Sequence, residues 1–354
     1  MNNTIEDNSP LRVALVGCGR IATRHVDALK ALSDRIHLVG AADPAAEARR
    51  WVEESTSVPT FPSLGEMLAR VPVDLVTLAT PTGLHPEQAV AAAEAGAHVL
   101  TEKPLGTRLD DARQMVSRVD ELRRRLFLVK QLRYHPLFLA VRDAVQTGRF
   151  GRLHTVSLQV FWCRPQAYYA EASWRGTRKL DGGALTNQAS HYVDLLDWLF
   201  GPVARVQALG GTLGREIEAE DTAVVSCQWE EGFLGSLHVT MLTYPANLTT
   251  CLTVIGERGT VRLGGRACDV VEAWDFDTPA PQDQTIEGLA RAVPETLRRG
   301  HQAVYEDLVE SLRGGVAPAV DGREGLRSLA IIDAAYRSFD TGEPVPVSRF
   351  EELP

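Results

Sequence analysis

The sequence predicts an α/β fold: a doubly wound parallel sheet followed by a second α/β domain with a large, mostly antiparallel open sheet. Over roughly the first 130 residues, short apolar runs alternate with helical patterns, which is typical of βαβ units. A glycine-rich turn, Gly17-Cys18-Gly19-Arg20-Ile21-Ala22, joins the first such strand to the first helix. Further along, the apolar runs follow one another directly, as they do in antiparallel sheets.

The predicted strands of the first domain are short, apolar and rich in β-branched residues, as buried parallel strands are. They cover residues 11–17, 36–43, 73–80, 98–103 and 125–130, with helical patterns near 21–32, 45–55, 63–70, 84–95 and 108–124. A further helix ends at Gly148 or Gly151, because glycine readily adopts the left-handed conformation that closes a helix. We expect a disordered tail at 1–10, a first domain at 11–131 and a second at 132–354.

The second domain reads as six strands interrupted by one long helix. The strands are expected at 153–162, 203–211, 222–229, 233–242, 247–256 and 260–265, with turn residues such as Glu231-Gly232 and Arg258-Gly259 between them. Helices are expected at 182–200, 301–313 and 323–339.

The composition excludes several classes of protein. With 44% hydrophobic and 23% charged residues and a formal net charge of −9, the chain is typical of a globular protein that binds neither nucleic acid nor membrane. No apolar stretch could span a bilayer, and the start MNNTIEDNSP is not a secretory signal. Five cysteines without CxxC spacing and nine histidines without HExxH spacing predict reduced thiols, a cytoplasmic protein and no metal site.

The glycine turn predicts a dinucleotide site. Gly17 permits the tight turn, and Gly19 leaves room for a pyrophosphate. Ala22 is small enough for the helix to pack closely on the strand. Backbone N–H groups at the helix start, around Arg20 and Ile21, would then bind the phosphates.

Asp43 predicts which dinucleotide binds. It ends the second strand, where a carboxylate accepts hydrogen bonds from the adenosine ribose hydroxyls. It would repel a 2′-phosphate, and its successors Pro44, Ala45 and Ala46 carry no compensating charge. NAD is therefore favoured over NADP. The alternative is that Asp43 only caps a turn or helix.

Three more segments follow predicted strands and reach the same sheet edge, where ligands of open parallel sheets bind. They add candidate cofactor contacts at Thr80, Pro81, His85, Glu102, Lys103 and Gln131. Lys103 precedes Pro104, which keeps it extended, and the alternative is an ordinary surface lysine.

The segment Trp174 to Gly201 carries the second half of a possible reactive site. Asn187 and His191 lie four residues apart on one predicted helix, and therefore on one face. Gly182 and Gly183 open that helix and would let its backbone approach a ligand. A histidine that only packs is the alternative. Together with Lys103, His191 predicts a proton-handling site beside a nucleotide cofactor.

Three motifs, GCGRIA, EKP and GGALxNQxSHYxDLLDWLxG, together resemble the glucose-fructose oxidoreductase and inositol dehydrogenase (Gfo/Idh/MocA) family. The resemblance runs from about residue 11 to about residue 345. It implies a Rossmann domain followed by an α/β domain whose open sheet often forms oligomer contacts, hence a homo-oligomer, dimer or tetramer. It also implies NAD as cofactor and a small-molecule substrate.

Within the family, three stretches are similar to enzymes that oxidise the sugar 3-hydroxyl of UDP-N-acetylglucosaminuronate. They begin FWCRPQAYY, DGGALTNQ and EDTAVVSCQW. The segments KQLRYHP, with Leu132, and RRGHQAVYEDL, around His301, depart from the pattern of those enzymes. The other open functions are a dehydrogenase or ketoreductase of another nucleotide sugar, a free sugar or an inositol, and a non-catalytic NAD-binding sensor.

By this resemblance, Lys103 would hydrogen-bond the reacting hydroxyl and His191 would accept its proton while hydride passes to the nicotinamide. Many family members carry Asp where this chain has Asn187, so either His191 or Lys103 could be the base. Arg164 can form a bidentate pair with a carboxylate or phosphate. The remaining predicted contacts are Tyr168, Tyr169 and Asn187 to the substrate, and Trp174 and Arg175 on the nicotinamide side.

Overall fold

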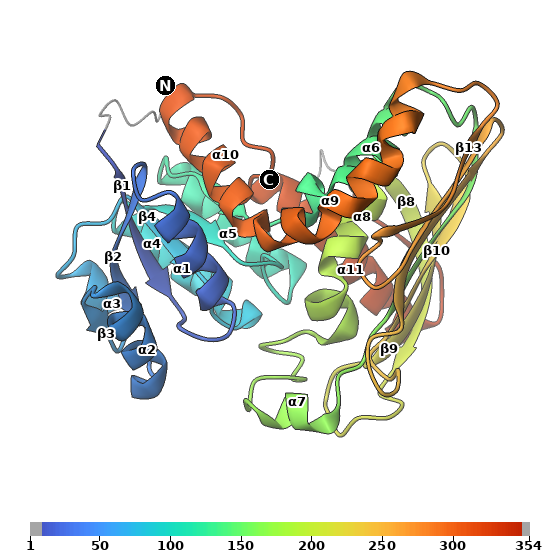
Figure 1. The fold of residues 1–354 in the computed structure, drawn as a ribbon. Coiled ribbons are helices and arrows are strands. Elements are labelled where there is room, and N and C mark those ends of the chain that lie inside the picture. The colour runs from blue at the N-terminus through green and yellow to red at the C-terminus, as the bar shows by residue number, and fades with distance from the viewer. Residues whose placement is uncertain (1–8, 349–354) are drawn as a thin grey trace. The chain divides into compact units, whose positions relative to one another are not determined.

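The chain forms two compact units in the computed structural model, which describes residues 9–348 (Figure 1). Residues 1–8 of the predicted tail lie outside the described part. Of the described residues, the first unit holds 9–131 together with Arg299–Leu326. The second holds Leu132–Arg298 and residues 327–348. The sequence prediction placed everything after residue 131 in the second domain, whereas Arg299–Leu326 returns to the first unit.

The first unit is built on a six-stranded parallel sheet with the order β3-β2-β1-β4-β5-β6. This order confirms the predicted doubly wound sheet, because it reverses direction at β1, which carries the glycine turn. The sequence analysis missed only β3, which has two residues. The strands are β1 Leu11–Val16, β2 Ile36–Ala42, β3 Thr60–Phe61, β4 Leu75–Leu78, β5 His98–Thr101 and β6 Leu126–Leu128.

Helices connect these strands in the predicted places. They are α1 Ala22–Ala31, α2 Ala46–Thr56, α3 Leu64–Leu68, η1 Thr82–Leu84, α4 His85–Glu94 and α5 Leu109–Glu121. Helix α10, Gly300–Gly314, packs against α1 (Figure 1). Its buried residues include His301, Val304, Tyr305 and Leu308. This contact with α1 is the reason that Arg299–Leu326 belongs to the first unit.

The second unit is built on an eight-stranded sheet with the order β13-β12-β11-β7-β10-β9-β8-β14. All neighbours are antiparallel except β7 and β10, which run parallel. The sheet confirms the predicted open antiparallel architecture and adds β13 and β14. Its strands are β7 Leu153–Phe161, β8 Val203–Gly211, β9 Thr222–Trp229, β10 Leu234–Thr240, β11 Thr249–Gly256, β12 Gly259–Gly264, β13 Val270–Phe276 and β14 Val345–Pro346.

Helices lie on one face of this sheet (Figure 1). The other face exposes apolar side chains such as Leu209 on β8 and Val224 on β9. The remaining helices are η2 Gln131–Tyr134, α6 Pro136–Gln146, α7 Gln166–Ala170, η3 Ala184–Gln188, α8 Ser190–Phe200, η4 Pro281–Thr285, α9 Ile286–Arg298 and α11 Gly322–Thr341. The sequence analysis did not predict α9.

The predicted helix 182–200 is wrong in its first half. Residues Ala184–Gln188 form a π-helical turn, closed by the Ala189 N–H donating to the Ala184 carbonyl at 2.9 Å, and α8 begins at Ser190. Asn187 and His191 therefore lie on different helical elements, and the expectation of a shared α-helical face does not hold. Such π turns within helices occur frequently at functional sites.

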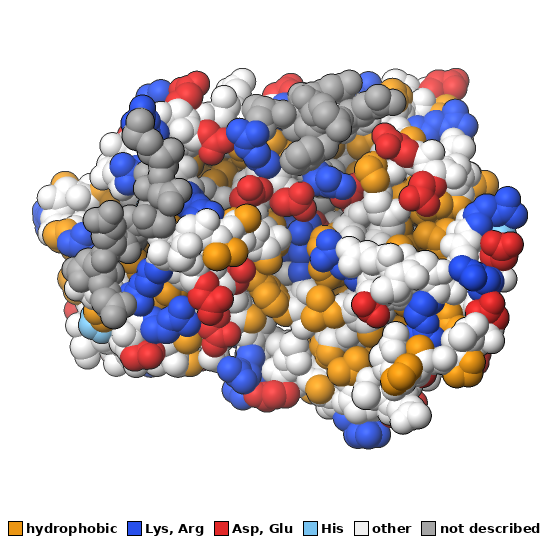
Figure 2. Space-filling model, turned by 90° about the horizontal axis from the view of Figure 1, so that it is seen from above, with side chains coloured by type: hydrophobic (Ala, Val, Ile, Leu, Met, Phe, Trp, Pro, Cys, Tyr) orange, Lys and Arg blue, Asp and Glu red, His pale blue; other side chains and the backbone are white. Residues whose placement is uncertain are grey.

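The surface and the cysteines agree with the composition. All five cysteines are free thiols. Within residues 9–348, no helix is both long and apolar enough to cross a membrane. Figure 2 shows acidic and basic side chains interspersed over the viewed face.

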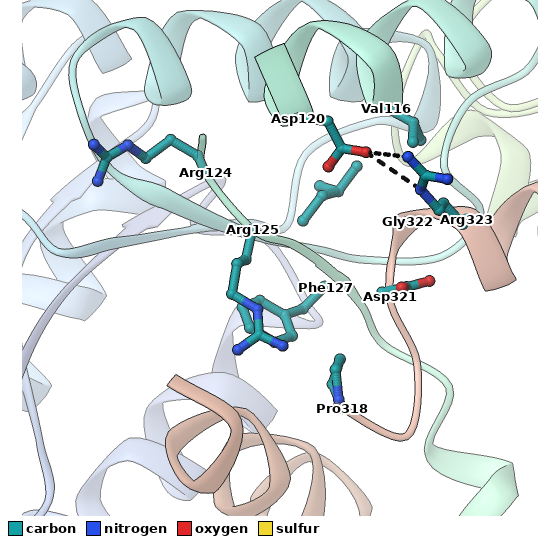
Figure 3. Close-up of a pocket in the computed structure, with 10 residues that line it drawn as sticks. Val116, Asp120, Arg124, Arg125, Phe127, Pro318, Asp321, Gly322 and Arg323 are labelled. Carbon is teal, nitrogen blue, oxygen red and sulfur yellow. Dashed lines mark hydrogen bonds and ion pairs between the residues drawn. The ribbon is translucent and has the colours of Figure 1, made fainter. Parts of the chain in front are cut away.

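One pocket lies beside β6, the edge strand of the first sheet (Figure 3). Two of its three arginines are already engaged: Arg323 Nη2 donates to Asp120 Oδ2 at 2.8 Å, and Arg125 Nη1 donates to the Ser311 carbonyl at 2.7 Å. The pocket therefore offers few uncommitted charges to a ligand.

A buried ion pair in the second unit links η2 to α8. Arg133 Nε donates to Asp194 Oδ2 at 2.9 Å and Arg133 Nη2 to Asp194 Oδ1 at 2.8 Å. The two side chains are only 5% and 4% exposed. Removing one partner of such a pair leaves a buried charge, which costs far more than removing both.

We expect Asp194→Ala to lower the free energy of unfolding by about 3–5 kcal/mol, measured by urea denaturation with tryptophan fluorescence. The double variant Arg133→Met with Asp194→Leu should show a much smaller decrease in the free energy of unfolding. Glu295→Ala, which breaks an exposed pair with Arg298, is the control and should change stability by less than about 1 kcal/mol. Equal losses for the single and double variants would contradict this account.

Candidate active site

The glycine turn of the first unit has the shape that a dinucleotide needs. Gly17 has φ +91°, and a Cβ there would lie 2.5 Å from the Ala79 carbonyl oxygen, so no other residue fits. A Cβ on Gly19 would meet no atom within 4 Å. Helix α1 begins directly after Ile21, which places its N-terminus at this open position. The turn therefore fits a pyrophosphate, as predicted.

Asp43 lies beside the turn and also holds it. The Cys18 N–H donates to Asp43 Oδ2 at 2.8 Å, and the Ala45 N–H donates to Asp43 Oδ1 at 2.8 Å. Trp51 Nε1, from α2, donates to the Cys18 carbonyl at 2.7 Å. The carboxylate keeps acceptor sites for ribose hydroxyls, since it has about four lone-pair positions. Trp51 carries no motif, and the sequence analysis missed it.

Arg49 is a second residue that the sequence analysis missed. Its Nη1 donates to the carbonyls of Asp43 and Pro44, at 2.6 and 3.0 Å. The sequence argument against NADP considered only the three residues after Asp43. Helix α2 brings the Arg49 guanidinium back to the Asp43 carbonyl, although Arg49 lies six residues further along the chain.

His85 joins two loops at the carboxyl edge of the sheet. It is buried, with Nδ1 2.8 Å from the Pro104 carbonyl and Nε2 3.0 Å from the Thr80 carbonyl. Burial lowers the pKa of His85, so the imidazole is neutral. Pro81 precedes η1, and Thr80 Oγ1 donates to Gln88 Oε1 at 2.6 Å. Through these contacts, His85 connects the loop after β4 to the loop after β5.

Glu102, predicted as a cofactor contact, is buried and bound by side chains of the first unit. Its Oε1 lies 3.1 Å from His25 Nε2 and 2.9 Å from His301 Nε2, and its Oε2 accepts from the Lys103 N–H at 3.2 Å. Although burial alone would raise it, the hydrogen bonds from the two imidazoles hold the pKa of Glu102 well below its usual range. Lys103 itself is half-buried.

Gln131, the first residue of η2, completes the predicted cofactor set. Its Oε1 is buried and accepts no hydrogen bond from any described residue. A bound donor would satisfy such an oxygen. Together with the cradle at Gly17, the open space at Gly19 and the carboxylate of Asp43, it makes the first unit fit NAD.

In the second unit, Asp181 orients Asn187. The Asn187 side-chain amide donates to Asp181 Oδ1, and the Gly176 N–H donates to Asp181 Oδ2 at 2.7 Å. His191 follows in the first turn of α8 and is 8% exposed. The sequence analysis missed Asp181, although it lies directly before the two glycines of the motif.

Glu220 explains the second of those glycines, Gly183. A Cβ on Gly183 would lie against Glu220 Oε2. The missing side chain therefore makes room for this carboxylate, whereas the sequence analysis expected it to make room for a ligand. Glu220 Oε1 accepts from the Leu185 N–H at 2.8 Å and from the Tyr336 hydroxyl at 3.0 Å. Burial, and to a lesser degree the charge of Asp181, raise the pKa of Glu220 to about 7.

Arg164 and Tyr168 lie together, as predicted. Arg164 Nε donates to Gln188 Oε1 at 3.0 Å, and Gln188 Nε2 donates to the Tyr168 hydroxyl at 3.2 Å. Arg164 Nη1 donates to Asn247 Oδ1 at 3.3 Å, whereas Nη2 donates to none of the described residues. The guanidinium is therefore held from one side and keeps a terminal nitrogen for an anionic ligand. Gln188 and Asn247 were missed.

The other predicted contacts lie around Tyr168. Arg175 Nη1 donates to the Tyr168 carbonyl at 2.7 Å, and its guanidinium lies 4.2 Å from the centre of the Tyr168 ring. Tyr169 is 7% exposed, and burial raises the pKa of its hydroxyl. Trp174 packs beside Arg175, with 5.6 Å between the guanidinium and the ring centre.

Two family models match successive parts of the chain. The NAD-binding Rossmann fold of an oxidoreductase family matches residues 11–130, and the C-terminal alpha/beta domain of the same family matches residues 142–347. D-apiose dehydrogenase of Paraburkholderia graminis is 25% identical, over 96% of this chain and 90% of its own.

Two solved structures are more similar. The WlbA dehydrogenase of Bordetella pertussis, in complex with NADH and UDP-GlcNAcA, matches with a TM-score of 0.95 and 47% identity, over 98% of this chain and 99% of its own. The WlbA dehydrogenase of Chromobacterium violaceum, with the same two ligands, matches with a TM-score of 0.93 and 46% identity, over 98% of each chain. With these matches and its NAD-compatible glycine turn, the chain belongs to the Gfo/Idh/MocA oxidoreductase family.

Proposed function

We propose that this enzyme oxidises the 3-hydroxyl of a UDP-linked N-acetyl sugar uronate with NAD. The observation that carries the proposal is Arg164, whose guanidinium is oriented by Gln188 and Asn247 and keeps Nη2 for a carboxylate. The two WlbA dehydrogenases, which were crystallised with UDP-GlcNAcA, support the same substrate class.

The proposed reaction divides its roles between two side chains. Lys103 hydrogen-bonds the reacting hydroxyl of the substrate. As the carbon–oxygen double bond forms, the hydroxyl proton passes to His191 or to Lys103. NAD, when bound, supplies the hydride acceptor. Asn187, oriented by Asp181, positions the substrate or the imidazole but adds no negative charge to it.

We also propose that the enzyme is a cytoplasmic homo-oligomer, a dimer or tetramer. The sheet face that bears the exposed Leu209 and Val224 supports self-association, since large exposed apolar surface usually marks an interface. The five free thiols are typical of a reducing compartment.

The preference for NAD over NADP follows from the carboxylate of Asp43, whereas Arg49 is the nearby cation that a 2′-phosphate would contact. We expect calorimetry to show NAD binding at least about tenfold tighter than NADP, or about 1.4 kcal/mol. Asp43→Asn keeps an acceptor for the Cys18 N–H but removes the charge that repels a 2′-phosphate. This variant should therefore show a smaller difference between its affinities for NAD and NADP. If Arg49 then contacts the 2′-phosphate, adding Arg49→Ala should restore the preference. Equal affinities in the wild type would contradict the role of Asp43.

The uronate assignment can be tested at Arg164. The wild type should turn over UDP-N-acetylglucosaminuronate with a much higher kcat/KM than UDP-N-acetylglucosamine. Arg164→Met should lower kcat/KM by about 10- to 100-fold for the acid only, the loss of a charge-assisted hydrogen bond. Arg152→Met, at the exposed start of β7, is the control. Equal wild-type kcat/KM for the two sugars, or faster turnover of myo-inositol, would rule the proposal out.

The catalytic roles predict a different pattern. Lys103→Ala and His191→Ala should each lower kcat by about 10²-fold or more and leave the affinity for NAD nearly unchanged.

The identity of the base can be tested at Asn187. In Asn187→Asp alone, the new carboxylate would meet the carboxylate of Asp181, so the test variant combines Asp181→Asn with Asn187→Asp. If His191 is the base, the lower limb of the kcat/KM pH profile should move upward, because the new carboxylate favours the imidazolium. Near wild-type kcat in His191→Ala would identify Lys103 as the base.

A further inference from the structure

We propose that buried imidazoles hold the backbone on both sides of Lys103, and that His25, His301 and His85 are positioning residues for proton transfer. The inference rests on the proposed role of Lys103. Glu102, directly before Lys103, is bound by His25 and His301, and Pro104, directly after it, is bound by His85. The side chains come from α1, α10 and α4, three segments far apart in the sequence.

The hydrogen bonds on the Glu102 side connect four side chains in a row, Thr77, Tyr305, His25 and Glu102. Thr77 Oγ1 lies 2.9 Å from the Tyr305 hydroxyl, which lies 3.0 Å from His25 Nδ1. Burial lowers the pKa of His25, so this imidazole is neutral and has one N–H. If Thr77 donates to Tyr305 and Tyr305 to His25 Nδ1, then His25 Nε2–H donates to Glu102. His301 Nε2 supplies a second donor to the same carboxylate oxygen.

This arrangement satisfies a buried carboxylate without moving it. An ionised carboxylate in a protein interior is stable only when several donors surround it. Glu102 has three: two imidazoles and the Lys103 N–H. The Glu102 N–H also donates to the Leu78 carbonyl at 2.8 Å, which ties the same residue to the end of β4.

The Pro104 side is held more simply. The neutral His85 has a single N–H and lies between the carbonyls of Pro104 and Thr80, so it donates to one of them. In either tautomer the imidazole fills the space between the two loops. The backbone of Lys103 is thus bounded by one anchored residue on each side.

The inference also gives the C-terminal return a function. Helix α10 contributes both His301 and Tyr305 to the Glu102 side. The sequence around His301 is one of the two places where the chain departs from the resemblance noted above. The departure therefore falls on a side chain that holds Glu102, next to Lys103.

The same three residues could instead ligate a cation. One donor atom from each of His25, Glu102 and His301 lies within 4.8 Å of the others. A metal ion would require both imidazoles to present bare Nε2 atoms, whereas hydrogen bonding requires both to carry protons there. The two accounts thus predict different metal contents.

The test compares His301→Ala with His301→Gln in the full-length enzyme, assayed with UDP-N-acetylglucosaminuronate. We expect His301→Ala to lower kcat by about 10- to 100-fold, with KM and NAD affinity changed less than about threefold. The side-chain amide of His301→Gln can still donate to Glu102 and should restore most of kcat. His37→Ala, at an exposed position on β2, is the control and should match the wild type.

Two further measurements keep the outcomes distinct. Glu102→Gln removes the buried charge next to Lys103 and should shift the kcat/KM pH profile toward lower pH, an effect that a merely structural role would not produce. Lys103→Ala is assayed in parallel. If it keeps wild-type kcat, the proposed function fails. If it loses kcat while His301→Ala keeps it, only the positioning inference fails.

If no sugar is turned over, the inference can still be decided from structure. Crystal structures of the wild type and His301→Ala should then differ at the Lys103 backbone. An unchanged Lys103 backbone would overturn the inference. So would equal loss of kcat in His301→Ala and His301→Gln, or about one metal ion per chain by elemental analysis with activity lost to a chelator.

Discussion

The first unit is organised around one buried carboxylate. Removing Glu102 from water would cost several kcal/mol unless donors replaced the solvent, and those donors come from three parts of the chain. Helix α1, the loop after β5 and helix α10 must therefore meet at one point. This requirement explains why a segment near the C-terminus belongs to the unit that begins the chain, and why Lys103 follows a residue that cannot easily shift.

The glycine turn of the first unit is fixed by a close backbone approach and by two side chains. Gly17 approaches the end of β4 so closely that a methyl group would collide with a carbonyl. Asp43 and Trp51 then hold the N–H and the carbonyl of Cys18, so the turn is already shaped for a pyrophosphate. A turn that is ordered beforehand loses less conformational freedom when a ligand binds.

The second unit prepares its part of the reaction in the same way. Glu220 occupies the space beside Gly183 and accepts a hydrogen bond from the Leu185 N–H of the π turn. Asp181 orients the Asn187 amide. Gln188, the last residue of that turn, holds Arg164. The residue proposed to bind the uronate and the residue proposed to assist proton transfer are thus supported by the same five-residue turn.

The sequence alone was enough for the parallel sheet, the glycine turn, Asp43 and the pairing of Arg164 with Tyr168, because these depend on periodicity and on neighbours close along the chain. It misplaced the helix across Asn187, where the π turn binds Glu220, a residue more than thirty positions away in the sequence, through the Leu185 N–H. It also missed Arg49, Trp51, Asp181 and the imidazoles around Glu102. Only tertiary structure brings these groups together, because buried charges and amides select partners by position in space and not by distance along the chain.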